Sequence, residues 1–385
     1  MRRSAVLAAL AVVLAAAAPA HAGPLVTFTT TSKFVDPAKV QFNSPPPDAP
    51  ARPNALRVNV LLPDGYTKRK RWPVLYLLHG HGDAYDYWIN PKRGNIGEIA
   101  KGFPGLIVMP EAARGWYANW WNGGARSPGW ESYHLGELTQ LVERRFRIRP
   151  GRRWHAIAGL SMGGLGAMYY ATQRPAYFGS AAAFSGVLNL QRPEWPQAMD
   201  TQGESHLDVY GDPSANRFYW TGHNPTALVD NLRHTRVYAT VGDGVPGDPV
   251  GEADNAFGAL AEAELRRQGD DFDAAARAAG LDLTYRPRGG IHDWPYWRAA
   301  VADALRWGFF EPVAEKPSRW RFSTVQRFSS AWGLRILFPK APDAVATFER
   351  DGKLLRATGS GLVRIRGPRG GRVARQLPFT VPYPR

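Results

Sequence analysis

An apolar run in the middle of the chain ends at a serine that has a glycine two residues before it and another two residues after it. The run closes with Gly159-Leu160-Ser161-Met162-Gly163, and the segment from Met162 to Thr172 contains the Ala, Met and Leu residues typical of a helix. This order predicts a strand, a sharp turn and a helix, with the serine in a strained conformation that the glycines permit because they lack a Cβ. The exposed hydroxyl of such a serine can attack a carbonyl carbon. An ordinary turn whose serine only caps the helix is the structural alternative.

A serine hydroxyl becomes a nucleophile at neutral pH when a base accepts its proton and an acid orients that base. His292 is the best candidate for the base, because it follows the last expected strand in a Gly-rich segment; a buried structural histidine is the alternative. Two positions compete for the acid. Asp243 comes directly after an expected strand, whereas Glu262 and Glu264 lie on the helix that follows it. Position in the sheet alone favours Asp243.

The negative oxygen formed by such an attack needs two N–H donors. His79-Gly80-His81-Gly82 follows a continuous apolar strand, which is where a hydrolase sheet places the first donor. We assign that donor to the backbone amide of His81 and the second to the amide of Met162. A metal pair formed by His79 and His81 is an alternative that has no third ligand nearby in the sequence.

Apolar runs alternate with helical patterns between residues 25 and 309. We expect strands at residues 25–31, 56–62, 74–78, 105–110, 180–185, 236–241 and 281–286, besides the one before Ser161, and helices at 131–146, 253–268, 271–279 and 294–309. This alternation predicts a mostly parallel sheet with helices on both faces. The irregular segment 188–231 is expected to cap the site. Trp120, in an aromatic loop, and Trp294 are predicted to bind substrate, with packing against the scaffold as the alternative.

The two ends of the chain differ from its middle. Residues 1–22 have a charged head, a short apolar run and the exit Ala20-His21-Ala22, which predicts a secretory signal peptide, with an uncleaved anchor as the alternative. We expect a catalytic domain in residues 23–311 and a small β-rich module in residues 312–385. Asp351-Gly352 predicts a hairpin in that module, and the arginines between residues 364 and 375 indicate a basic face.

Composition narrows the possible functions. The 385 residues include no cysteine, which excludes disulfides, a thiol nucleophile and thiolate metal sites. The formal net charge of +15 indicates attraction to anionic surfaces, such as a cell-envelope polymer. No nucleic-acid motif is visible, so we expect no nucleic-acid partner, and no run beyond the N-terminal one is long enough to span a membrane. Asp243, Asp248, Glu252 and Asp254 suggest calcium but lack a recognisable ligand loop.

Three segments resemble the secreted antigen 85 mycolyltransferases and the wider esterase D-like group. They are Gly159-Leu160-Ser161-Met162-Gly163, Ile291-His292-Asp293-Trp294-Pro295-Tyr296-Trp297, and the stretch from Asn224-Pro225-Thr226 to Thr235-Arg236-Val237-Tyr238. The resemblance covers residues 54–309, implies an α/β-hydrolase fold, and places the acid at Glu262 on the helix after the strand. It also implies the amides of His81 and Met162 as oxyanion donors. Members that acylate trehalose carry an aspartate and an arginine in the oxyanion loop. The matching positions here are His79 and Gly82, so the resemblance does not extend to trehalose as acceptor or mycolate as acyl group.

The sequence therefore predicts a secreted serine esterase or acyltransferase with an α/β-hydrolase fold and a C-terminal β-rich module. Ser161, His292 and Glu262 are the predicted triad, the substrate is an ester of a lipid or a sugar, and the acceptor is water or a sugar hydroxyl. No cofactor and no metal are expected. The alternative is a non-catalytic protein that keeps the hydrolase scaffold and binds a cell-wall or other anionic polymer.

Overall fold

The computed structural model describes residues 23–45, 51–121, 127–247 and 255–384. The predicted signal peptide, residues 1–22, lies outside this part of the chain, as do Asp248, Glu252 and Asp254. Among the described helices, none is both long and apolar enough to cross a lipid bilayer.

The larger part of the molecule is built on one sheet, formed within the described residues by eight strands in the order β1-β2-β4-β3-β5-β6-β7-β8. The strands are β1 (Leu25–Thr30), β2 (Leu56–Leu61), β3 (Val74–Leu78), β4 (Leu106–Pro110), β5 (His155–Leu160), β6 (Ser180–Phe184), β7 (Arg236–Thr240) and β8 (Leu283–Tyr285). All pairings from β4 to β8 are parallel, and those of β1 with β2 and of β2 with β4 are antiparallel. The carboxyl ends of β5, β6 and β7 therefore meet at one edge of the sheet, where an active site is expected.

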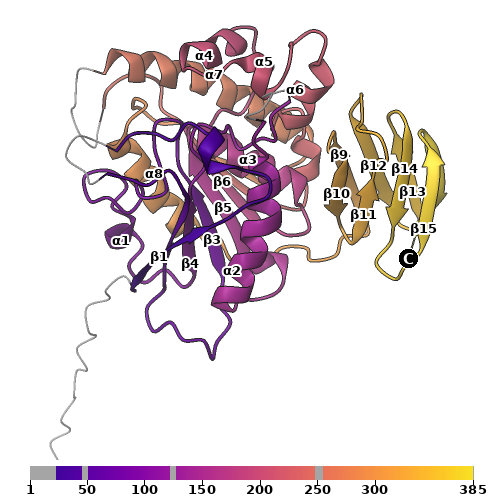
Figure 1. Cartoon of the computed structure of the whole chain (residues 1–385), viewed down its shortest axis with the longest axis horizontal. Helices are drawn as coiled ribbons and strands as arrows, with labels where there is room; N and C mark the ends of the chain where they lie inside the picture. Colours follow the sequence, from indigo (N-terminus) through magenta and orange to yellow (C-terminus); the bar gives the residue numbers. More distant parts are fainter. Residues whose placement is uncertain (1–22, 46–50, 122–126, 248–254, 385) are drawn as a thin grey trace, which may run out of the picture.

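Helices cover both faces of this sheet (Figure 1). The α-helices of the described part are α1 (Ile96–Ile99), α2 (Thr139–Phe146), α3 (Met162–Gln173), α4 (Trp195–Thr201), α5 (His206–Val209), α6 (Arg217–His223), α7 (Ala256–Ala278) and α8 (Trp294–Trp307). A π-helical segment, η3 (Ser132–Leu138), leads into α2, and short 3-10 turns are η1 (Pro37–Lys39), η4 (Arg152–Trp154) and η5 (Val229–Leu232). In β3, Tyr76 packs into the core on the α3 side and Leu75 into the core on the α8 side. This alternation explains why the strand is apolar throughout.

The expectation of two helices between residues 253 and 279 is wrong, because α7 is continuous from Ala256 to Ala278. Gly269 does not end the helix. A Cβ at this position would lie 2.7 Å from the hydroxyl of Tyr285 on β8, so the glycine allows α7 to pack closely on the sheet.

The C-terminal residues form two antiparallel four-stranded sheets, seen in orange and yellow at the right of Figure 1. One contains β10 (Phe328–Ala331), β11 (Leu334–Leu337), β14 (Leu362–Arg366) and β15 (Arg372–Gln376), and the other contains β9 (Arg319–Thr324), β12 (Ala346–Asp351), β13 (Leu354–Thr358) and β16 (Phe379–Pro382). They enclose a core of their own that includes Trp320, Phe322 and Phe348. The β-like runs that the sequence shows in this module, at residues 334–338, 344–350, 353–357 and 362–366, correspond only to β11, β12, β13 and β14. The hairpin predicted at Asp351-Gly352 joins β12 to β13.

The β module is fixed to the larger part by specific polar contacts. The side chain of Asn231 donates to the carbonyl oxygen of Ser323 and accepts from its N–H, both at 2.8 Å. Val325 is buried in the main core, and Gln326 donates to the buried carboxyl group of Glu131 at 2.7 Å. The β9–β10 connection therefore serves as the docking segment of the module.

Candidate active site

Ser161 lies at the turn between β5 and α3 in a conformation that side-chain-bearing residues rarely adopt, with φ 52° and ψ −122°. Its amide donates to the carbonyl oxygen of Phe184 at 2.9 Å, which ties the turn to β6. The neighbouring glycines are needed for space. A Cβ on Gly159 would lie 2.2 Å from the carbonyl oxygen of Gly163, and one on Gly163 would lie 2.5 Å from that of His79. The predicted strand, sharp turn and helix are therefore present.

Ser161, His292 and Glu262 form a hydrogen-bonded row. The Nε2 atom of His292 lies 2.9 Å from Oγ of Ser161, and its Nδ1 atom lies 2.7 Å from Oε2 of Glu262. A carboxylate can only accept, so Nδ1–H donates to Glu262 and Nε2 is left to accept from the serine hydroxyl. The three side chains come from the β5–α3 turn, the loop before α8, and α7. Residues separated by up to 131 positions in sequence thus meet at one point.

Glu262 is held as an acceptor from two further directions. Its side chain is 1% exposed, and its Oε1 atom accepts from the hydroxyl of Ser185 and from the amide of Gly242, both at 2.6 Å. Three donors therefore surround this buried carboxylate and fix its orientation. Ser185 in turn accepts from the indole N–H of Trp297 at 3.1 Å.

Asp243, the acid that position in the sheet favours, does not contact His292. It is exposed, and its Oδ1 atom accepts from the amides of Val245 at 2.9 Å and Gly290 at 3.2 Å. Asp243 therefore organises the loops around the site. Glu264, the other acid on α7, is paired with Arg192 and Arg267 instead.

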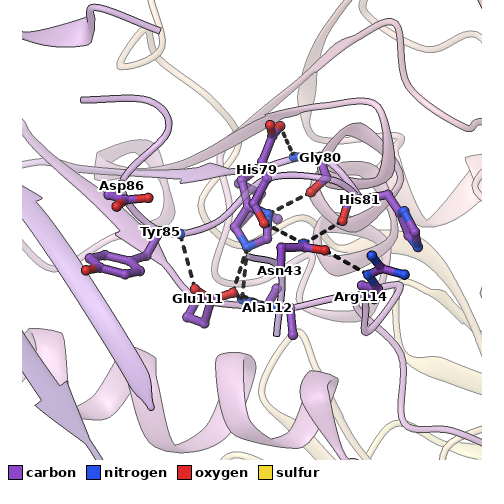
Figure 2. A network of polar contacts seen from close by, with 12 residues as sticks. Asn43, His79, Gly80, His81, Tyr85, Asp86, Glu111, Ala112 and Arg114 are labelled. Carbon is purple, nitrogen blue, oxygen red and sulfur yellow. Dashed lines mark hydrogen bonds and ion pairs between the residues drawn. The ribbon is translucent and has the colours of Figure 1, made fainter. Parts of the chain in front are cut away.

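The segment after β3 is clamped from several sides (Figure 2). Asn43 donates through its side-chain amide to the carbonyl oxygens of both His81 and Asp83 at 2.7 Å, and its Oδ1 atom accepts from Nε of Arg114 at 2.8 Å. Glu204, from the segment between α4 and α5, contacts the imidazole of His81. These contacts fix the path of the backbone on either side of residue 81.

The amides of His81 and Met162 donate to no protein acceptor within the described residues. Both ring nitrogens of His79 are hydrogen-bonded to the backbone: Nδ1 lies 2.8 Å from the carbonyl oxygen of Gly80, and Nε2 accepts from the amide of Ala112 at 3.0 Å. Across the described ranges, no cluster of three or more His, Cys, Asp or Glu residues is placed to hold a metal ion.

Ser161 and His292 open into a cavity of about 720 Å³. Four tryptophans contribute to its lining, namely Trp116, Trp195, Trp294 and Trp297. Trp294, which the sequence predicts to bind substrate, is thus one of the lining residues. Trp120 is not among the lining residues; its indole N–H donates to the carbonyl oxygen of Gly115 and its ring packs against the main core.

Trp116 and Trp195 were not among the residues predicted to bind substrate. Both belong to segments singled out in the sequence: Trp116 precedes Trp120 in the aromatic loop, and Trp195 begins α4 in the segment expected to cap the site. Their rings meet edge to face at 5.8 Å and form one wall of the cavity. Phe257 and Leu260 of α7 also line the cavity and are 72% and 75% exposed, so the opening has an apolar border.

Comparisons with known proteins agree with this architecture. Residues 51–307 match the family described as "Putative esterase". Esterase Rv1288 of Mycobacterium tuberculosis is 35% identical over 196 residues, which are 48% of this chain and 42% of that protein, so this chain spans less than half of its length. The diacylglycerol acyltransferase/mycolyltransferase Ag85A of Mycobacterium gordonae is 28% identical over 250 residues, 60% of this chain and 70% of that protein.

Among solved structures, FphF, a fluorophosphonate-binding serine hydrolase of Staphylococcus aureus, matches with a TM-score of 0.57 and 20% identity, covering 76% of this chain and 100% of that one. At 20% identity, this structural similarity supports the assignment of the fold and nothing more. The sequence matches confirm the resemblance to antigen 85 and esterase D-like proteins. The observed sheet and the similar solved structure confirm the expected fold. The chain is an α/β-hydrolase with a C-terminal β module and belongs to this esterase family.

Proposed function

We propose that this chain is a secreted serine esterase or acyltransferase that acts on acyl esters through an acyl-enzyme intermediate. The observation that carries the proposal is the hydrogen-bonded row from Ser161 through His292 to Glu262, which opens into an apolar cavity. Membership of an esterase family supports the same reaction class. Secretion is proposed from the composition of residues 1–22.

In this mechanism His292 is the general base. Because Glu262 holds the proton of Nδ1, Nε2 is free to accept the proton of Ser161 as Oγ attacks the carbonyl carbon of the ester. The carboxylate 2.7 Å away stabilises the imidazolium that forms. His292 then returns the proton to the departing alkoxide, which leaves the acyl group on Ser161.

The amides of His81 and Met162 are the proposed donors to the oxygen that becomes negative during the attack. Met162 begins α3, so the positive end of the helix dipole acts in the same direction. The clamp by Asn43 and Glu204 keeps the residue 81 amide in place without movement during the reaction. Preorganised donors of this kind contribute several kcal/mol to a lower barrier, typically about 3–4 for each donor removed.

The second half of the reaction transfers the acyl group from Ser161 to water or to a sugar hydroxyl. His292 removes the proton of the acceptor and returns it to Ser161. The tryptophan wall and the apolar border formed by Phe257 and Leu260 favour an apolar or aromatic acyl group. Trp294 is the proposed binding residue that the sequence already indicated.

Labelling with a fluorescent fluorophosphonate tests the proposal, because only an activated serine reacts. We expect rapid labelling of the folded protein, loss of labelling in Ser161→Ala, and strong slowing in His292→Gln. Labelling that is absent in the wild-type protein, or unchanged in Ser161→Ala, would refute the enzymatic mechanism. The first of these results would favour the non-catalytic polymer-binding protein. Product analysis with a lipid ester, with and without added sugar, separates hydrolysis from acyl transfer.

A further inference from the structure

The sheet β10-β11-β14-β15 presents a row of arginines to solvent. In the strand register Arg335 of β11 pairs with Arg366 of β14, and Arg366 pairs with Arg372 of β15. All three side chains are exposed, and Arg364 lies on the same face beside Leu337. We call Arg335, Arg366 and Arg372 the arginine row. Three like charges thus stand next to one another on three neighbouring strands.

This arrangement costs stability, because like charges directly opposite on paired strands repel. No carboxylate offsets the repulsion: within the described residues the arginine row makes no ion pair and no hydrogen bond through its side chains. The other sheet of the module is different. Arg319 pairs with Asp351 at 2.9 Å, and Glu349 stands in register between Arg321 and Arg356. The same module therefore neutralises its arginines on one sheet and leaves them unpaired on the other.

Net charge is concentrated in the same region. Residues 312–385 contain fifteen Lys and Arg and four Asp and Glu, a formal net charge of +11 within a chain whose total is +15. The catalytic part is close to balanced by comparison. The basic face expected from the tail sequence is thus a property of one sheet surface, and a concentrated positive field attracts anionic ligands.

A cleft of about 930 Å³ adjoins the arginine row, between the β module and the larger part of the molecule. The turns at Trp332-Gly333 and Pro368-Arg369, at the end of the sheet where the row lies, form one of its walls. Other lining groups are the basic side chains Arg71, Arg149 and Lys316 and the aromatic rings of Tyr177 and Tyr383. Of the two acidic residues there, Glu315 is engaged through its carboxylate by the amides of Arg152 and Arg153.

We propose that the arginine row and this cleft bind a linear acidic polysaccharide. Adjacent strands are about 5 Å apart, so the row offers a guanidinium at intervals comparable to one sugar unit of an extended chain. Guanidinium groups bind carboxylates through two parallel hydrogen bonds. Single-stranded nucleic acid fits less well, because Phe328 is the one aromatic ring exposed on the described face and base stacking needs several. A concave cleft also suits a chain better than a flat bilayer.

The test compares two triple variants that remove the same charge. Arg335→Gln/Arg366→Gln/Arg372→Gln removes the arginine row, and Arg319→Gln/Arg321→Gln/Arg356→Gln removes three arginines from the other sheet. Binding of a fluorescein-labelled oligogalacturonate is measured by fluorescence anisotropy at low and at physiological salt. We expect the row variant to bind at least about tenfold more weakly, with a shallower salt dependence, and the control variant to change by less than about threefold.

Folding is checked in the same samples. The row variant should melt at the same or a higher temperature than wild type, since repulsion is removed, and should hydrolyse a small soluble ester at the wild-type rate. Equal loss of binding in both triple variants would overturn the proposal, because only net charge would then matter. Equal binding of neutral dextran, or stronger binding of poly(U) RNA or phosphatidylglycerol vesicles through the arginine row, would overturn the ligand class. The proposal is independent of the esterase activity, so either can fail alone.

Discussion

Replacing Glu262 by glutamine separates the role of its charge from the role of its shape. The Oε1 atom of Glu262 accepts from Ser185 and Gly242, and Oε2 accepts from Nδ1–H of His292. Glutamine has one acceptor oxygen, which will stay where two donors meet. Its NH₂ group then faces Nδ1 of His292. The imidazole must move its proton to Nε2, and it can no longer accept the proton of Ser161.

The expected loss follows from this change of tautomer. In serine proteases the equivalent substitution lowers kcat by about 10⁴-fold, so we expect Glu262→Gln to lower kcat by about 10³- to 10⁴-fold, a barrier increase of about 4 to 5 kcal/mol. KM should change little, because Glu262 is buried behind His292 and does not line the cavity. The assay is steady-state hydrolysis of a chromogenic short-chain ester, with the melting temperature measured in parallel.

Asp243→Asn is the matched control, since it removes one carboxylate charge next to the same site. Asparagine can keep both hydrogen bonds that Oδ1 accepts from Val245 and Gly290, so kcat should stay within about threefold of wild type. A larger loss in Asp243→Asn than in Glu262→Gln would transfer the orienting role to Asp243. A folded Glu262→Gln protein that keeps more than about a tenth of wild-type kcat would refute the tautomer argument.

Three further predictions concern stability and positioning. Burial raises the pKa of Glu131 from 4.5 to about 8, so the folded state retains a proton that the unfolded state loses. The free energy of unfolding should therefore fall as pH rises from about 4.5 to about 8. Urea unfolding should show this loss in wild type and a smaller one in Glu131→Gln. Gly163→Ala should lower stability by about 2–3 kcal/mol, because its Cβ would lie within 2.6 Å of two backbone oxygens. Gly136→Ala, in a helical segment with no atom within 4 Å of its Cβ, should leave the melting temperature unchanged or raise it, by up to about 1 kcal/mol of stability. Asn43→Leu should lower kcat about tenfold with little change in KM, since the residue 81 amide loses its clamp; an unchanged kcat would show that Glu204 alone holds the loop.

Much of the sheet could be predicted from sequence because its central strands are buried on both faces. β3 is apolar throughout and β5 is apolar after His155, so each gives a clear local signal. The Ser161 turn could be predicted for a similar reason, since the requirement for glycine at positions 159 and 163 is local. The role of His292 as the base could be predicted because the residue follows the last strand of the sheet.

The acid could not be predicted from local sequence. Glu262 lies two turns into α7, and only the packing of that helix against the sheet brings its carboxylate back to His292. Asp243 has the more obvious position but its side chain turns to solvent and to loop amides. The edge strands β10, β15 and β16 were missed for a different reason: β10 and β16 have four residues each, β15 has no buried residue, and β16 follows Pro378 and ends at Pro382. The six-residue β9 was also missed, although Trp320 and Phe322 are buried.

The distribution of charge connects the two proposals. The catalytic cavity lies at the end of the parallel sheet, whereas most of the net positive charge belongs to the β module. The Asn231–Ser323 pair and the burial of Val325 join these two parts through well-packed contacts, so the module is not a loosely tethered appendage. A polymer held on the arginine row would therefore hold the Ser161 cavity at a fixed distance and orientation. In that arrangement, loss of the arginine row should lower the rate on polymer-bound esters. The rate on small soluble esters should stay the same, because the chemistry itself depends only on the distant hydrogen bonds among Ser161, His292 and Glu262.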